Sequence, residues 1–246
     1  MTRRRLFGTL GAGAGSLAGA TVLADRYGLV PPDANGIWAP GHTLTFAAHR
    51  VFGANALAHE YRSDQITRPP HANGKPPSDE AFLRHKANGF ADWRLEIGGL
   101  VERPRSFSVA EIKAMPSRSQ VTSLACEEGW NYIAEWTGAP LAHVLDLVGM
   151  KSHARFVFYH SIQKNWWDSV DMVDALHPQT LVAYGFNGGD LPVEHGGPLR
   201  VRVPRQLGYK SVKFVTRLTV TDSLRDFGKG MGSQAAEHGY AWYSGI

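Results

Sequence analysis

Cysteine is nearly absent from this sequence, which has one thiol, Cys126, among 246 residues. A single cysteine excludes an intrachain disulfide and a zinc site of the C-x-x-C type. The 11 histidines show neither H-E-x-x-H nor H-x-x-x-H spacing, and no G-x-S-x-G nucleophile elbow occurs. The common metalloprotease and serine hydrolase motifs are therefore missing, while a zinc site made by histidines that are distant in sequence stays open.

The chain also lacks a strongly apolar run of the roughly 20 residues that a membrane span needs. Its nearest approach, residues 8–24, is diluted by glycine and follows the stretch Arg-Arg-Arg-Leu-Phe at 3–7. A basic stretch, a modest apolar stretch and small residues before a cleavage site are the parts of a secretory signal. Paired arginines indicate the twin-arginine type. We expect residues 1–24 to be an export signal, or a membrane anchor if it is not cleaved.

Acidic residues are slightly outnumbered, 22 against 26 basic residues, for a net charge of +4. Removal of the arginines at 3–5 leaves 26 minus 3, or 23, basic residues against the same 22 acids. Nucleic-acid binding depends on a large excess of positive charge. A nearly neutral exported protein is not expected to have a nucleic-acid partner.

Positive charge without acids is confined to the segment between His195 and Thr221. Its bases are Arg200, Arg202, Arg205, Lys210, Lys213 and Arg217. Such bases lie either on a solvated face or around an anion. Gly196, Gly197 and Gly208 would let backbone N–H groups approach an anion closely. A ligand that carries a phosphate would suit this segment.

Paired prolines predict irregular structure over residues 25–90, with a wrapping arm at 25–59 ahead of a single domain at 60–246. Farther along, alternation of apolar and polar residues predicts strands. These strands are expected over 93–97, 120–125, 155–159, 180–184 and 213–221. A capping box at Ser108 opens a short helix that ends before Pro116, and helical spacing predicts another over 141–148. The pattern is that of an α+β fold with a mostly antiparallel or mixed sheet.

Four motifs occur in order. Residues 125–130 read Ala-Cys-Glu-Glu-Gly-Trp, 136–141 Trp-x-Gly-x-Pro-Leu, 197–200 Gly-Pro-Leu-Arg and 204–213 Pro-x-x-x-Gly-Tyr-Lys-x-x-Lys. Together they resemble the metal-binding and pterin-phosphate segments of the sulfite oxidase family of molybdopterin-dependent oxidoreductases. The resemblance covers roughly residues 60–246, and the chain is similar to the exported, catalytic-domain-only type found in the methionine sulfoxide reductase branch.

This resemblance implies a mixed α+β domain that binds Mo-molybdopterin. By the motif match, Cys126 is the metal ligand and the catalytic residue, and Arg200 and Lys213 pair with the cofactor phosphate. Further pterin contacts are implied for His71, Asn73, Ser161, His195, Ser211 and Val212.

Some positions depart from the family pattern. Ala72 stands where sulfite oxidases proper have an arginine, which argues against sulfite as the substrate. Ser161 and His195 stand where the reductase branch has threonine and asparagine. Trp166 and Trp167 would lie near the mouth of the pocket, and residues 239–246 resemble the ordered tail of the family.

The implied activity is two-electron oxygen-atom transfer to or from a small sulfur or nitrogen oxo compound, by a periplasmic or otherwise exported monomer. Because the dimerisation and haem domains of some relatives are not expected, electrons would be exchanged with a separate partner, by analogy a membrane cytochrome b. The alternative is a metal-free secreted binding protein that keeps the fold and an anion-binding groove, and a zinc hydrolase is more distant. The substrate, the direction of catalysis and the partner's identity stay open.

Overall fold

The computed structural model describes residues 28–246 and divides into two compact units, residues 1–53 and 54–246. The expected export signal at 1–24 lies outside the described residues. Within residues 28–246, no helix is both long and apolar enough to cross a membrane. The domain boundaries expected after residues 24 and 59 remain predictions.

The described part of the first unit contains the 3-10 turn η1 (Gly36–Trp38) and the helix α2 (Ala39–Phe52). The expectation of an irregular segment is wrong for these residues. Pro40 lies in the first turn of α2, where its missing N–H would have no helical partner in any case. Pro40 is therefore compatible with the start of α2, and the paired prolines of residues 25–90 lie outside this helix.

The second unit contains the strands and most of the helices. The strands are β1 (Arg94–Gly99), β2 (Arg105–Ser108), β3 (Arg118–Ala125), β4 (Asn131–Pro140), β5 (Phe156–Ser161), β6 (Trp167–Asp171), β7 (Leu181–Phe186), β8 (Gly189–Asp190), β9 (Arg200–Arg202) and β10 (Val215–Thr221). The helices and 3-10 turns are η2 (Ser63–Gln65), α3 (Glu80–Ala87), α4 (Val109–Lys113), α5 (Leu141–Leu147), α6 (Met172–Ala175), η3 (Val193–His195), η4 (Gly208–Lys210) and α7 (Gln234–Glu237).

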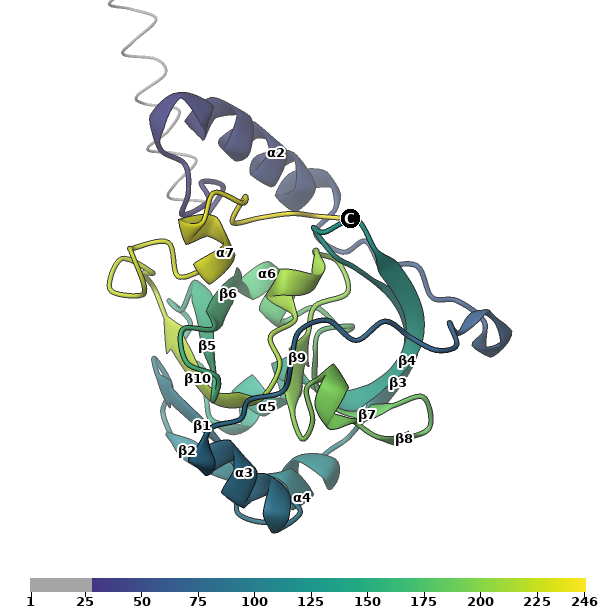
Figure 1. Ribbon diagram of the computed structural model, residues 1–246. Helices are drawn as coiled ribbons and strands as arrows, with labels where there is room; N and C mark the ends of the chain where they lie inside the picture. Colours follow the sequence, from purple (N-terminus) through teal and green to yellow (C-terminus); the bar gives the residue numbers. More distant parts are fainter. Residues whose placement is uncertain (1–27) are drawn as a thin grey trace, which may run out of the picture. The chain divides into compact units, whose positions relative to one another are not determined.

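The strands form two sheets, shown in Figure 1. One sheet has the order β2-β1-β10-β5-β6, and the other has the order β3-β4-β7-β8 with β9 paired to β7. β1 and β10 run parallel, whereas β1–β2, β10–β5 and β3–β4 are antiparallel. The α+β fold with mixed strand directions is confirmed, and the five predicted strands coincide with β1, β3, β5, β7 and β10.

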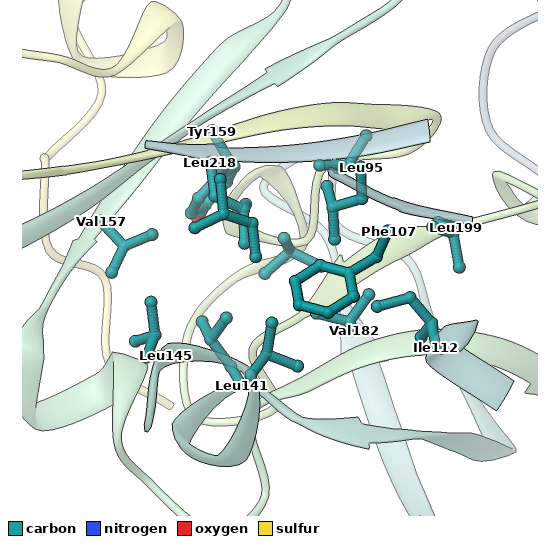
Figure 2. Packing of buried hydrophobic residues seen from close by; sticks show 14 of the residues in the cluster. Leu95, Phe107, Ile112, Leu141, Leu145, Val157, Tyr159, Val182, Leu199 and Leu218 are labelled. Carbon is teal, nitrogen blue, oxygen red and sulfur yellow. The ribbon is translucent and has the colours of Figure 1, made fainter. Parts of the chain in front are cut away.

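The hydrophobic core collects side chains from both sheets and from α4 and α5. Figure 2 shows Leu95 and Leu218 of the first sheet facing Val182 of the second, with Leu141 and Leu145 of α5 alongside. All five are at most 1% exposed. Since a fully buried aliphatic side chain contributes about 1.5–3 kcal/mol, this cluster is the main source of stability in the second unit.

Two local signals of the sequence are borne out in detail. Ser108 Oγ accepts from the Glu111 N–H over 3.1 Å, and a Glu111 carboxylate oxygen accepts from the Ser108 N–H over 2.8 Å, which is the expected capping box of α4. The C-terminal segment is ordered, because Trp242 is completely buried and its indole donates to Ser169 Oγ over 3.0 Å.

Candidate active site

Cys126 lies directly after β3, in the loop that leads into β4. Its N–H donates to the Trp130 carbonyl over 2.9 Å, and its carbonyl accepts from the Gly129 N–H over 3.1 Å. Gly129 has a φ of 91°, a conformation that side chains rarely adopt. This tight loop fixes the thiol at the end of the strand, where the residue is 9% exposed.

A cavity of about 210 Å³ opens beside this thiol. Seven of the nine residues expected to contact metal or pterin line it. These seven are His71, Asn73, Cys126, His195, Arg200, Ser211 and Lys213. The fold thus joins segments separated by more than a hundred residues, and it does so around the one thiol of the chain.

Ser161 and Val212 are not part of this lining. Ser161 Oγ accepts from the Gln163 N–H over 3.0 Å and so shapes the turn that brings Gln163 to the cavity. Val212 is 1% exposed in the core, and its carbonyl accepts from the Val201 N–H over 3.1 Å. A direct pterin contact by either residue remains a prediction.

The guanidinium of Arg200 is held rigidly at the cavity wall. Its Nη1 donates to the His195 carbonyl over 2.7 Å, its Nη2 donates to the Ser211 carbonyl, and its Cζ lies 5.0 Å from the centroid of the Trp136 ring. Burial lowers the pKa of Arg200 from its usual value. Among the described residues its Nε has no hydrogen-bond partner, although Arg200 is only 3% exposed. A buried donor without a partner is unfavourable unless a ligand satisfies it.

Lys213 is the second cation in the lining. Its Nζ donates to the carbonyls of Asn73 over 2.7 Å and Glu194 over 2.6 Å. Burial, together with the positive charge of Arg200, lowers the pKa of Lys213 to about 8. The ammonium is therefore easily deprotonated unless an anion stabilises it.

The two glycines before Arg200 have a different role from the one expected. The Gly196 N–H donates to the Val193 carbonyl over 2.9 Å and the Gly197 N–H to the Pro192 carbonyl over 3.0 Å, so the expectation that they approach an anion is wrong. Gly196 has a φ of 101°, and a Cβ there would lie 2.7 Å from Lys213 Cγ. Glycine is needed at this position so that the turn can pack against the Lys213 side chain.

His195 is a neutral group in this site. Burial, with Lys213 and Arg200 nearby, lowers its pKa to about 4. Its ring stacks on Phe186 at 4.3 Å, and Nδ1 lies 3.4 Å from Tyr132 Oη. With Nδ1 facing Tyr132, the neutral imidazole can offer Nε2 to a ligand without adding charge.

Of the six bases between residues 195 and 221, Arg200 and Lys213 line the cavity, and the other four stabilise the fold. The partners of these four are Ser123 for Arg202, Ala54 for Arg205, Asp168 for Lys210 and Glu96 for Arg217. The two alternatives therefore divide among the six bases: Arg200 and Lys213 line the cavity, Arg217 lies on a solvated face, and the others meet acceptors elsewhere in the fold.

The Cys126 thiol is protonated in the absence of a metal. Burial raises its pKa to about 12, and the carboxylates of Glu127 and Glu128 act in the same direction. A metal cation removes this penalty, because coordination deprotonates a thiol outright. Within residues 28–246, no three His, Cys, Asp or Glu side chains lie close enough to hold a metal ion together.

Comparison with known proteins identifies the family. The sequence profile of the oxidoreductase molybdopterin-binding domain matches residues 83–226 of this chain. The protein belongs to this family. The resemblance to the sulfite oxidase family is confirmed, the protein is an oxidoreductase, and its cofactor is molybdopterin.

Two curated relatives illustrate the similarity. The putative protein-methionine-sulfoxide reductase subunit YedZ1 of Azospira oryzae is 35% identical over 79% of this chain and 70% of that protein. The protein-methionine-sulfoxide reductase catalytic subunit MsrP of Xanthomonas axonopodis pv. citri is 33% identical over 54% of this chain and 46% of that protein. The chain thus spans about half the length of MsrP.

A solved structure agrees with the fold. The sulfane dehydrogenase SoxCD from Paracoccus pantotrophus superposes with a TM-score of 0.51 and 27% identity, over 54% of this chain and 39% of that chain. This similarity supports a sulfite-oxidase-like, molybdopterin-binding domain.

The residues of the cavity fit molybdopterin. The family cofactor carries a phosphate, and the lining offers a guanidinium with an unpartnered Nε together with an ammonium. It also carries a metal, and Cys126 offers a soft sulfur ligand on the same wall. The donor set of the cavity therefore matches both ends of this molybdenum–pterin group.

Some lining residues were not assigned from the sequence. Gln163, Tyr209 and Phe214 reach the cavity through the tertiary fold, and Tyr132 follows Cys126 by one short hairpin. Trp166 lies in the lining as expected for the pocket mouth, whereas its neighbour Trp167 belongs to β6. No local pattern marks Gln163 or Phe214, whereas alternation along residues 131–136 could have indicated Tyr132.

The affinity of the cofactor-free protein for a sulfate ion will fall about tenfold as the pH rises through about 8. Below that pH Lys213 is protonated and attracts the anion, and above it Arg200 acts alone. Calorimetric titration with sulfate at about pH 6.5 and about pH 9.5 measures the change, because sulfate keeps its charge over this range. Lys213→Met should bind weakly at both pH values. If sulfate affinity still fell as much between the two pH values in Lys213→Met, the titrating group would be a residue other than Lys213.

Proposed function

We propose that this protein is an exported molybdenum enzyme that reduces S-oxides, with methionine sulfoxide in proteins as its substrate. The observation that carries the proposal is the joining of Cys126, Arg200 and Lys213 in one cavity of a molybdopterin-family domain. The names of the relatives support the substrate, since both YedZ1 and MsrP are called protein-methionine-sulfoxide reductase subunits.

The proposed roles of the residues follow from their chemistry. Cys126 is the thiolate ligand of the metal, and Arg200 and Lys213 hold the cofactor phosphate through charge-assisted hydrogen bonds. His71, Asn73, Ser161, His195, Ser211 and Val212 would contact the pterin. When bound, the cofactor supplies the two-electron redox chemistry, while the protein positions it and controls access.

The proposed reaction balances with an external reductant. A sulfoxide accepts two electrons and two protons, its S–O bond breaks, and a thioether and water leave. Because the cavity residues supply no electrons, a separate electron-transfer partner must do so. We infer a membrane partner of the cytochrome b class, in keeping with the word subunit in the names of both relatives.

Export to the periplasm through a twin-arginine signal at residues 1–24, and a monomeric catalytic chain, belong to the same proposal. The export proposal rests on the Arg-Arg-Arg-Leu-Phe stretch and the glycine-diluted apolar run of the sequence. A cofactor inserted in the cytoplasm would then travel with the folded chain.

The purified full-length protein is expected to contain about one molybdenum per chain and to reduce methionine sulfoxide in a peptide with a reduced viologen dye as the electron donor. Elemental analysis and dye oxidation measure the two quantities. Molybdenum without sulfoxide turnover would contradict the substrate. A chain that stays metal-free after cofactor-replete expression would favour the binding-protein alternative.

A further inference from the structure

Two carboxylates lie beside the residue that is proposed to bind the metal. A Glu127 carboxylate oxygen accepts from Cys126 Sγ over 3.3 Å. The Glu128 carboxylate accepts from the Trp130 indole over 2.8 Å, which fixes it beside the same wall. Glu127, Glu128 and Trp130 all line the cavity. Glu127 is half-buried, so its charge is only partly screened by water.

The charges of the lining do not cancel evenly once the cofactor is considered. Under the proposed function, Arg200 and Lys213 are neutralised by the cofactor phosphate. What remains is the half-buried Glu127, since Glu128 and Lys75 are both exposed and therefore well screened. The neighbourhood of Cys126 Sγ is then net negative. A like charge at contact distance in a partly hydrated site weakens anion binding about tenfold.

We propose that Glu127 is a specificity-determining residue, whose negative charge admits neutral S-oxides to the site and rejects oxyanions such as nitrate and sulfite. This inference rests on the proposed function and identifies the residue that selects the substrate's charge. Trp130 and Trp166 complement it, because their rings offer an apolar contact for the carbon groups of a neutral sulfoxide. Ala72 beside the cavity residue His71 adds no positive charge that would attract an anion.

The first test uses the loaded full-length enzyme and compares kcat/KM for dimethyl sulfoxide with kcat/KM for nitrate, both with a viologen dye. Glu127→Gln is expected to shift the ratio about tenfold toward nitrate, mainly through the KM of the anion. Glu127→Asp keeps the charge and should keep the ratio. Glu80→Gln, at an exposed position outside the lining, is the matched control. A ratio unchanged within about twofold in Glu127→Gln would overturn the proposal.

The second test needs no activity. Because the chain has one cysteine, alkylation of the full-length, cofactor-free protein reports on Cys126 alone. The ratio of rates with anionic iodoacetate and neutral iodoacetamide should rise about tenfold in Glu127→Gln. Any change in thiol reactivity affects both reagents and cancels in the ratio. An unchanged ratio would overturn the role of Glu127, whereas a protein without molybdenum or turnover would overturn the proposed function alone.

Discussion

Replacement of Cys126 by alanine is expected to remove molybdenum and sulfoxide turnover while leaving the fold intact. The variant loses the one soft ligand in the cavity lining. Loss of an outer partner of a metal ligand already costs 10- to 100-fold in affinity or activity, so loss of the ligand itself should exceed about 100-fold. The alanine side chain still fits, because the loop is held by backbone hydrogen bonds of Trp130 and Gly129.

Metal and pterin are expected to be lost together in this variant, because the pterin of the family cofactor is itself a ligand of the molybdenum. Arg200 and Lys213 are untouched, so any cofactor that remains is expected to be held through its phosphate. Elemental analysis, pterin fluorescence after release and circular dichroism measure metal, pterin and fold. Ser119→Ala on the same strand, where Ser119 Oγ lies 2.7 Å from Thr137 Oγ1 at the exposed edge, should keep all three. Full molybdenum and full turnover in Cys126→Ala would show that another group binds the metal.

The strands and the two short helices were predictable because their signals are local. Alternation in residues 94–97 places Leu95 and Ile97 in the core and Arg94 and Glu96 in solvent, as β1 shows. The capping box at Ser108 needs only residues within one turn. Helix α2 was not predicted, because paired prolines were taken to indicate irregular structure throughout residues 25–90, although none of the pairs lies within Ala39–Phe52 and the single Pro40 is tolerated in the first helical turn.

The site was predictable only where motif resemblance carried tertiary information. The resemblance assigned His71 and Lys213 to one cofactor site, although 142 positions separate them in the sequence. Charge composition alone failed for the basic segment, since Arg202 and Lys210 point to acceptors on other strands. Whether a basic side chain contacts a ligand or a buried partner depends on the strand order, and the strand order cannot be predicted from the spacing of residues within one segment.

Replacement of Lys210 by methionine is expected to have the largest effect on the free energy of unfolding. Lys210 is fully buried, and its ammonium donates to Asp168 over 2.6 Å and to the Ser169 carbonyl over 3.0 Å. It also lies 4.4 Å from the Trp242 ring of the C-terminal segment. Lys210→Met leaves the buried carboxylate of Asp168 with Ser233 as its remaining side-chain partner. Breaking a buried pair from one side costs about 3–5 kcal/mol.

The loss should depend on pH with a definite sign. Burial already raises the pKa of Asp168 above its ordinary value even though Lys210 and Ser233 oppose the shift. Without Lys210 the pKa rises further, so the folded state holds a proton that the unfolded state has released. Stability of the variant therefore falls as the pH rises from the unfolded pKa, about 3.9, through the raised folded pKa, and it recovers in acid.

Urea unfolding of three variants separates charge from packing. Lys210→Met combined with Asp168→Asn should recover most of the lost free energy, because the unpaired charge is gone. Arg217→Met breaks the exposed pair with Glu96, whose nitrogen–oxygen distance is 2.8 Å, and should cost no more than about 1 kcal/mol. Equal losses in Lys210→Met and in Arg217→Met would contradict this account. If the two losses of unfolding free energy differ as expected, the difference arises because Lys210 is buried whereas Arg217, in the same acid-free segment, is exposed to solvent.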